Sequence, residues 1–228
     1  YIVEETTENS FDGMDIVLGA AENDIAEKYL PIAAEKGAVV VDNSSAFRLD
    51  EQVPLIIPEV NPQAVREHHG IIANPNCATI IALVALQPLH AYANAKRMVV
   101  STYQAVSGAG VNGIRELNQQ VGALAHGKEI AVNTFQYQIA YNLIPQIGGF
   151  NEAGYSSEEM KMQNEGRKIM SNPELCVNCT CVRVPVIRSH SESIMVEIEK
   201  EISVEKAREL LQGAPGVKLV DEPQKQVY

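Results

Sequence analysis

One stretch decides the fold of this chain: Asn74-Pro75-Asn76-Cys77-Ala78-Thr79-Ile80. The apolar run 70–73 before it predicts a buried strand, and the apolar run 79–86 predicts a buried helix. Cys77 therefore falls at a helix N-terminus, where unpaired backbone N–H groups and the helix dipole favour thiolate over thiol. A small buried structural cysteine is the commoner alternative. The spacing of polar residues elsewhere in the chain favours the nucleophile.

The residues before this stretch predict a strand–helix–strand unit. The segment 14–21 is predicted to be an apolar strand that ends in a small-residue turn, a helix over 25–36 ends at Gly37, and a strand follows over 38–42. Continuous apolar runs of this kind are typical of parallel strands that are covered on both faces. The first part of the chain is therefore predicted to be an incomplete Rossmann-like parallel-sheet nucleotide domain.

After Cys77 the pattern changes to longer strands and separate helices. Strands are predicted over 97–105, 179–187 and 193–202, and helices over 110–125 and 204–211, whereas two short predicted strands, over 55–57 and 71–73, precede Cys77. The predicted fold class is α/β, with residues 1–76 forming the nucleotide domain and residues 77–228 forming an α+β domain with a mixed sheet.

Composition and charge exclude several classes of function. The chain has 228 residues with 46% hydrophobic and 21% charged residues, which is ordinary for a globular protein. Its net charge of −11 argues against nucleic acid or an anionic membrane as a partner. The sequence holds no apolar run of the roughly 20 residues that span a bilayer and no secretion signal. A cytoplasmic location is expected.

Three of the four cysteines lie together as Cys176, Cys179 and Cys181. A structural zinc site usually needs four ligands in paired units, and the sequence has no second unit. We therefore expect reduced strand cysteines and no metal, although the role of the three is open.

Six segments resemble the aspartate-semialdehyde dehydrogenase family, in the family's order along the chain: 41–48, 53–61, 74–77, 102–110, 158–161 and 183–192. The resemblance implies NADPH-dependent reduction of L-aspartyl 4-phosphate to the semialdehyde and phosphate, through a cysteine thioester. It also implies NADP(H) as cofactor, a homodimer formed through a catalytic and dimerisation domain over 77–228, and a place in the biosynthesis of lysine, threonine, methionine and isoleucine.

The resemblance also assigns catalytic roles to single residues. Cys77 matches the acylated nucleophile, His190 the general acid/base, and Gln104 the residue that orients substrate beside the thiol. Arg183 matches the residue that binds the substrate α-carboxylate, and Glu158 matches the contact to its amino group. We expect Arg183 and His190 to lie close together on a strand pair or its rim. For a lone histidine, a structural role is the usual alternative.

Further positions match the phosphate and cofactor sites of the family. Arg48 and Lys161 match the phosphate-site cations, and Asn76 is a further contact beside the nucleophile. Ser107 and Gly108 match a cofactor-contacting loop. Simpler interpretations exist for two of these motifs. Glu158 and Lys161 also fit an i,i+3 pair on an exposed helix, and the Ser-Gly-Ala-Gly turn also fits a plain strand-to-helix connection.

Three alternatives and one question stay open at this point. The chain fits a related acyl-phosphate reductase, such as N-acetyl-glutamyl-phosphate reductase or glyceraldehyde-3-phosphate dehydrogenase, less well. A non-catalytic dimerisation paralogue would be expected to lose Cys77 or His190. The family's Gly-rich phosphate-binding turn is expected before Tyr1 and its last segment after Tyr228, so we expect a fragment. Because the segment that reads the adenosine ribose is expected before Tyr1, the sequence does not distinguish NADP from NAD.

Overall fold

The computed structural model describes residues 2–228, which form two compact units. The first unit runs to Ala93 and includes Asn164–Glu174 and Glu201–Tyr228, and the second comprises Asn94–Gln163 and Leu175–Lys200. These units are defined by packing, and their limits differ from the domain boundary that the sequence predicts between residues 76 and 77. That boundary stays a prediction.

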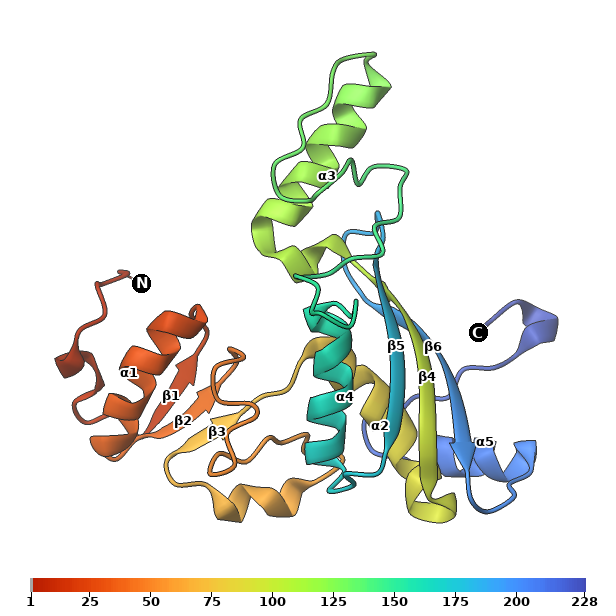
Figure 1. Ribbon diagram of the computed structural model, residues 1–228, viewed down its shortest axis with the longest axis horizontal. Helices are drawn as coiled ribbons and strands as arrows, with labels where there is room; N and C mark the ends of the chain where they lie inside the picture. Colours follow the sequence, from red (N-terminus) through yellow and green to blue (C-terminus); the bar gives the residue numbers. More distant parts are fainter. Residues whose placement is uncertain (1) are drawn as a thin grey trace. The chain divides into compact units, whose positions relative to one another are not determined.

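The first unit is built on a parallel sheet of three strands, β1 (Ile16–Gly19), β2 (Val39–Asp42) and β3 (Ile71–Ala73), in that order. Helix α1 (Asn23–Glu35) connects β1 to β2 and contacts all three strands, so it covers one face of the sheet (Figure 1). Its buried residues form a small core with Phe11 and Val40. Parallel strands need such a crossover helix, because a hairpin cannot join them.

Two further helices belong to the first unit. Helix α2 (Cys77–Ala93) follows β3, and α5 (Val204–Gln212) packs against it. This unit also contains the 3-10 helices η1 (Glu8–Phe11), η2 (Pro62–Glu67) and η4 (Pro223–Lys225). Across the described residues, we find no helix that combines the length and the apolar character needed to cross a bilayer.

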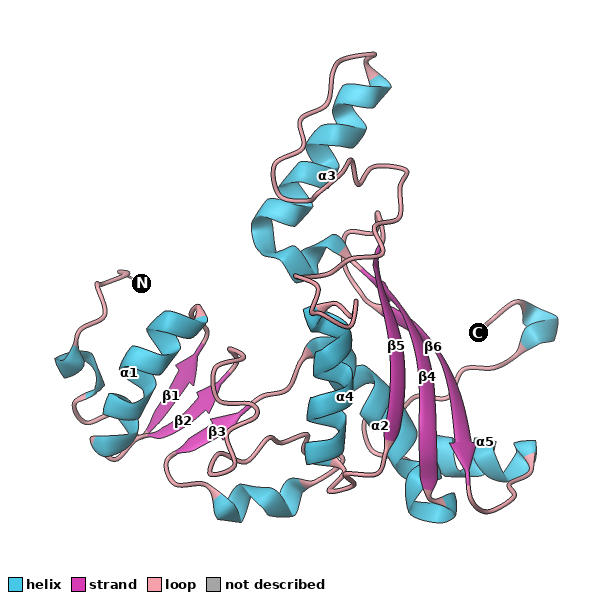
Figure 2. Ribbon diagram, viewed as in Figure 1, coloured by secondary structure: helices cyan, strands magenta, loops and turns pink. Residues whose placement is uncertain are grey.

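The second unit is built on a mixed sheet of β4 (Ala95–Gln104), β5 (Cys176–Arg183) and β6 (Ser191–Ile198) (Figure 2). The central strand, β4, pairs in parallel with β5 and antiparallel with β6. After β4 come η3 (Val106–Ala109) and α3 (Gly110–Ala125). Helix α3 and the chain after it share a core of five buried residues: Val106, Leu117, Ile139, Ala140 and Ile144.

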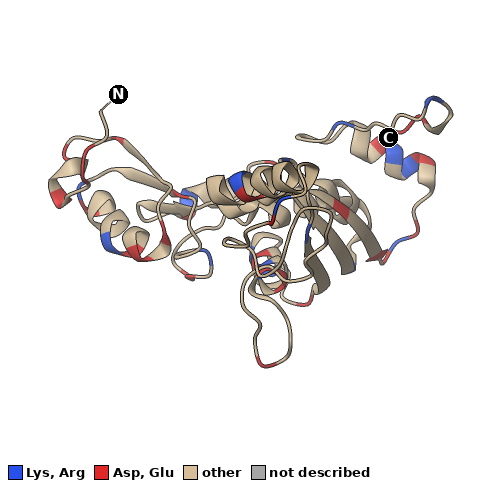
Figure 3. Ribbon diagram, turned by 90° about the horizontal axis from the view of Figure 1, so that it is seen from above, with Lys and Arg blue, Asp and Glu red and all other residues tan. Residues whose placement is uncertain are grey.

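Helix α4 (Ser157–Ile169) contributes to both units, its residues up to Gln163 to the second and those from Asn164 to the first. Acidic and basic residues are interspersed along the ribbon of both units (Figure 3).

The predicted fold class is confirmed: a parallel sheet is followed by a mixed sheet. Three predicted strands were wrong in extent. In 55–57 only Leu55 forms an isolated bridge, because flanking prolines interrupt the ladder, and β5 ends at Arg183 just before the Pro185 segment. Strand β6 ends at Ile198, four residues before the predicted end at residue 202. Helix α4 was not predicted as an element of the fold.

Candidate active site

Cys77 is exposed and is the first residue of α2, directly after the loop that leaves β3. The side chain of Asn76 caps this helix, because its Oδ1 accepts hydrogen bonds from Ala78 N at 3.0 Å and Thr79 N at 3.3 Å. The predicted placement of the thiol at a helix N-terminus is therefore confirmed. Its role as the nucleophile remains a prediction.

Arg48 is buried and holds the loops that follow β2 and β3. Its Nε donates to the carbonyl oxygen of Asn74 at 2.9 Å, and its Nη2 donates to that of Asn43 at 3.1 Å. The third contact joins Nη1 to Oε1 of Glu165 at 3.2 Å. Glu165 was missed in the sequence, where its only signal is its position seven residues after Glu158 on one helix face.

The first unit has the sheet edge at which dinucleotides bind in open α/β folds. Because β1, β2 and β3 are parallel, their carboxyl ends, Gly19, Asp42 and Ala73, meet at one edge. Cys77 follows the last of these strands by four residues. This arrangement fits a nicotinamide dinucleotide, and it puts the thiol at the same edge.

Gln104 and Glu158 form a buried polar chain in the second unit. The Thr102 hydroxyl donates to Gln104 Oε1 at 3.0 Å, and Gln104 Nε2 donates to Glu158 Oε1 at 3.1 Å. Lys161 donates to the other carboxylate oxygen of Glu158 at 3.1 Å. The Glu158 side chain is only 8% exposed. Glu158 and Lys161 are thus not the solvent-exposed i,i+3 pair of the simpler interpretation. Gln104 is also buried and does not face solvent.

Arg183 and His190 both contact Ala105, the residue after β4. Arg183 Nη1 donates to the carbonyl oxygen of Ala105 at 2.7 Å, and Ala105 N donates to His190 Nδ1 at 3.0 Å. The neutral imidazole therefore carries its hydrogen on Nε2. Burial, and then the charge of Arg183, lower the pKa of His190, while Glu158 acts in the opposite direction. The two residues lie close together, as the sequence predicts.

Gly108, in the turn after β4, lies too close to the side chain of Arg183 to carry a side chain of its own without displacing it. A Cβ on Gly108 would lie 2.6 Å from Nη1 of Arg183, so a side chain there displaces the guanidinium. Ser107 N donates to the carbonyl oxygen of Ile187 at 3.2 Å, and Gly108 N donates to that of Ala105 at 3.1 Å. The cofactor contacts of Ser107 and Gly108 stay predictions.

The cysteines of β5 show no metal-binding arrangement in the described part of the chain, where no group of three or more His, Cys, Asp or Glu could hold an ion. Cys179 and Cys181 are buried with their Sγ atoms 3.5 Å apart, and Cys176 is exposed. The contact with Cys181, followed by burial, raises the pKa of Cys179, which keeps it a thiol.

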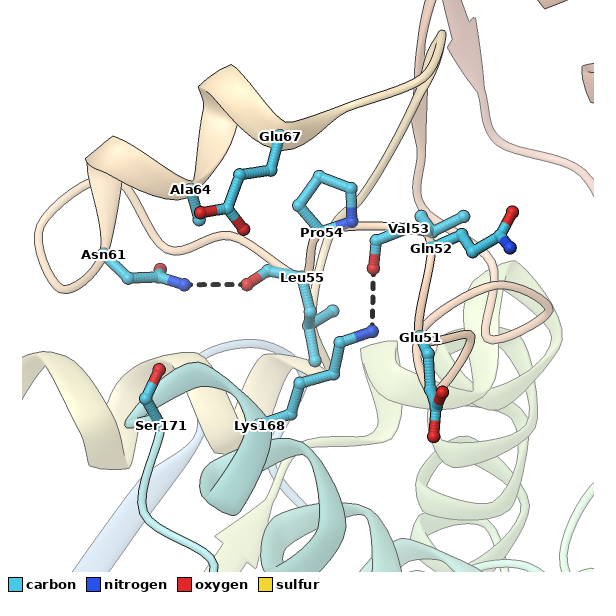
Figure 4. A pocket seen from close by; sticks show the side chains of 10 residues that line it. All are labelled: Glu51, Gln52, Val53, Pro54, Leu55, Asn61, Ala64, Glu67, Lys168 and Ser171. Carbon is cyan, nitrogen blue, oxygen red and sulfur yellow. Dashed lines mark hydrogen bonds between the residues drawn. The ribbon is translucent and has the colours of Figure 1, made fainter.

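A pocket of about 200 Å³ in the first unit is lined by Lys168 and Ser171, by the loop after Arg48, and by residues at the start of and within η2 (Figure 4). Lys168 Nζ donates to three backbone carbonyl oxygens, those of Arg48 at 2.9 Å, Asp50 at 2.6 Å and Val53 at 2.7 Å. Burial lowers the pKa of Lys168, and the nearby acidic residues Asp50 and Glu51 oppose that change. An ammonium group has three N–H donors, so these three bonds use all of them and hold the loop against α4.

The predicted site residues fall into two sets, one in each unit. The first unit holds Arg48, Asn76 and Cys77. The second unit holds the remaining predicted residues: Gln104, Ser107, Gly108, Glu158, Lys161, Arg183 and His190.

Both parts of the chain match known family profiles. Residues 1–68 match "Semialdehyde dehydrogenase, NAD binding domain" and residues 86–228 match "Semialdehyde dehydrogenase, dimerisation domain". These matches cover most of the chain, and they agree with a parallel sheet that precedes a mixed sheet.

Individual relatives agree with these profiles. The chain is 52% identical to the aspartate-semialdehyde dehydrogenase of Aquifex aeolicus over 97% of its own length and 66% of that protein. The crystal structure of aspartate semialdehyde dehydrogenase II from Vibrio cholerae, complexed with ASA, has a TM-score of 0.90 and 46% identity. That match covers 91% of this chain and 62% of the other.

A more distant structure, from Candida albicans and determined with NADP, has a TM-score of 0.66 and 25% identity, over 87% of this chain and 55% of the other. The chain thus spans about two thirds of the length of the first two relatives. On the family profiles and these identities, this chain belongs to the aspartate-semialdehyde dehydrogenase family.

Proposed function

We propose that this chain carries the catalytic cysteine of an enzyme that reduces L-aspartyl 4-phosphate to L-aspartate 4-semialdehyde and phosphate with NADPH. The observation that carries the proposal is the exposed Cys77 thiol at the first residue of α2, in a chain of this family. The associated predictions are a cytoplasmic enzyme and a role in the biosynthesis of lysine, threonine, methionine and isoleucine.

In the first step the Cys77 thiolate attacks the acyl carbon of the substrate. A carbon–sulfur bond forms, the bond from that carbon to the phosphate oxygen breaks, and phosphate leaves with the electron pair. Arg48 and Lys161 are proposed to bind the phosphate, because cations at a leaving group stabilise the charge that develops there. The product of this step is a thioester on Cys77.

A nicotinamide cofactor would supply, when bound, the hydride that adds to the acyl carbon of the thioester on the way to the aldehyde. Cys77 then leaves as thiolate when its carbon–sulfur bond breaks, which regenerates the nucleophile. Gln104 is proposed to orient the acyl group; its side chain is fixed at both ends by Thr102 and Glu158, so little freedom is lost when substrate binds.

His190 is proposed to move the proton in these steps. In the tautomer that the bond from Ala105 N implies, Nε2–H is a donor, which suits a hydrogen bond to the substrate carbonyl oxygen. To take a proton at Nε2, the ring must instead carry its hydrogen on Nδ1 and give up the bond from Ala105 N. The lowered pKa keeps the ring neutral near pH 7.

The second unit carries groups of the right charge for an amino acid. Arg183 is proposed to bind the α-carboxylate, because its planar guanidinium forms two parallel hydrogen bonds. Glu158 is proposed to bind the ammonium group of the substrate. An N-acetylated substrate has no ammonium group, so this pair favours the aspartyl substrate over the N-acetyl-glutamyl one.

NADP(H) is proposed as the cofactor. The carboxyl edge of the parallel sheet supports a dinucleotide, and the relative from Candida albicans was determined with NADP. Ser107 and Gly108 are proposed as further contacts.

A homodimer formed through the second unit is also proposed. The matched profile is named for dimerisation. In addition, Val99 and Met195 are direct cross-strand partners on the mixed sheet and are 36% and 54% exposed. Apolar side chains on an exposed sheet face are typical of interfaces.

The test is phosphate-dependent NADP⁺ reduction by the full-length protein with L-aspartate 4-semialdehyde, compared with the Cys77→Ala variant. Activity in the parent and its loss in the variant are expected. A folded parent that binds NADP⁺ but reduces it only with N-acetylglutamate semialdehyde would reject this substrate in favour of the related reductase. A Cys77→Ala variant with parental activity would reject the nucleophile.

A further inference from the structure

Glu165 is a buried carboxylate beside the predicted nucleophile, and the proposed mechanism does not use it. Its side chain is 2% exposed. One oxygen, Oε1, accepts from Arg48 Nη1 at 3.2 Å, and the other, Oε2, accepts from the backbone N–H of Asn76 at 2.7 Å. A single side chain thus joins the predicted phosphate-site arginine to the backbone N–H of Asn76, the residue before Cys77.

The same helix holds Arg48 at a second point. Lys168, one turn after Glu165 on α4, donates to the carbonyl oxygen of Arg48 at 2.9 Å. Glu165 therefore fixes the side chain of Arg48, and Lys168 fixes its main chain. Residues three apart lie on one face of a helix, so both contacts come from the same face of α4.

Fold stability alone does not account for this buried ion pair. Removing two charges from water costs free energy, and apolar residues of similar volume often stabilise a fold as well or better. The Arg48 guanidinium is already held by the carbonyl oxygens of Asn43 and Asn74. The negative charge of Glu165 is what the backbone contacts cannot supply, and it offsets the charge of Arg48.

We propose that Glu165 is a positioning residue that fixes the Asn76 peptide at the start of α2 and offsets the charge of Arg48, so that phosphate is bound without being held too tightly. The inference rests on the proposed roles of Cys77 and Arg48. It assigns Glu165 no contact with substrate; the residue acts through its two neighbours.

The test replaces the charge and keeps the shape, in Glu165→Gln of the full-length protein. An amide has one acceptor oxygen, so it can satisfy Arg48 or the Asn76 N–H but not both. We expect kcat to fall about tenfold, because the α2 start is less well fixed. The KM for phosphate should fall about threefold or more, because Arg48 is no longer neutralised. The KM for NADP⁺ should change less than about twofold.

A second readout does not depend on turnover. Loss of a negative charge beside the α2 start favours the thiolate, so alkylation of Cys77 by iodoacetamide at pH 7 should be about threefold faster. The matched control is Glu27→Gln, an exposed glutamate on α1, which should leave all of these values unchanged.

Glu165→Asp separates charge from position and serves if Glu165→Gln does not fold. Its carboxylate is one methylene shorter, so it keeps the charge but cannot span both partners. We expect a lower kcat with the phosphate KM and alkylation rate of the parent.

Two results would overturn the inference. One is a phosphate KM that rises together with the KM for NADP⁺, which indicates general disruption. The other is an unchanged kcat and alkylation rate in Glu165→Gln. If instead the parent shows no activity, the proposed function fails, and the alkylation rates still decide whether Glu165 acts on Cys77.

Discussion

Gly108 leaves room for the guanidinium of Arg183, and this close approach gives a prediction at the scale of one residue. In Gly108→Ala the new Cβ would lie 2.6 Å from Nη1, so the flexible arginine tip moves and its bond to Ala105 is weakened. We expect the KM for the semialdehyde to rise about tenfold, while the free energy of unfolding changes by less than about 0.5 kcal/mol.

Steady-state kinetics and urea denaturation check this together. Gly122→Ala is the matched control, because a Cβ there meets nothing within 4 Å. A Gly108→Ala enzyme with the parental KM would show that Arg183 does not need its observed position.

His190 gives a prediction about pH. Burial and Arg183 lower its pKa below the ordinary 6.5, so the neutral ring persists to lower pH than usual. If the reaction needs the neutral ring, kcat/KM stays constant as pH falls past 6.5 and declines only below it. The pH profile of kcat/KM measures this, with His190→Asn as the variant that loses the acid limb. An acid limb at or above pH 6.5 would contradict the assignment.

At the residue scale the sequence predicts the local features well. The place of Cys77 follows from the apolar runs on either side, which are adjacent in the chain. The contacts of Arg48 do not follow in this way, because Glu165 lies 117 residues away and Lys168 lies 120 away. Such pairs depend on the tertiary placement of α4 beside Arg48. Periodicity in the sequence predicts local elements and not contacts between residues this far apart.

At the scale of elements, strand β6 carries a buried carboxyl group with a measurable effect on stability. Within the described residues, neither carboxylate oxygen of Glu192 has a hydrogen-bond partner, and both oxygens are buried. Burial raises the pKa of Glu192 to about 8, from an ordinary value of 4.5. The folded protein therefore keeps this group protonated at pH 7, whereas the unfolded chain ionises it.

Because the folded state binds the extra proton, the contribution of Glu192 to stability is greatest below about pH 4.5 and is lost as pH rises towards about 8. Between pH 5.5 and 8.5 we expect the free energy of unfolding of the parent to fall by on the order of 1 kcal/mol more than that of Glu192→Gln. This figure is discounted for the solvent near the rest of the side chain. Urea midpoints of parent and variant at the two pH values measure the difference. Equal pH dependence in the two proteins would show that Glu192 is ionised in the fold.

The elements that the sequence predicts best are those with a clear local period. Helix α3 spans Gly110–Ala125 in both prediction and structure, because its apolar residues recur every three or four positions. Helix α4 was missed, since its charged residues point inward to pair with one another and with distant loops. A helix that buries charges does not show the usual apolar stripe.

At the scale of the whole molecule, the exposed face of the mixed sheet predicts how the protein assembles. If Val99 and Met195 are buried between two copies, Met195→Glu places a charge in an apolar contact and favours the monomer. Light scattering after size-exclusion chromatography gives the mass of parent and variant. Ile25→Glu, the same change in chemistry at a half-exposed residue of α1, should leave the mass unchanged. A dimeric Met195→Glu protein would place the interface elsewhere.

The central claim is that Cys77 carries the acyl group, and a single-turnover experiment without phosphate tests it most directly. The full-length protein is mixed with NADP⁺ and L-aspartate 4-semialdehyde, and NADPH absorbance is followed while the Cys77 peptide is analysed by mass spectrometry. We expect a rapid burst of NADPH equal to the number of active sites, an aspartyl adduct on Cys77, and steady turnover only after phosphate is added. Steady phosphate-dependent turnover with no burst and an unmodified Cys77 would contradict the account.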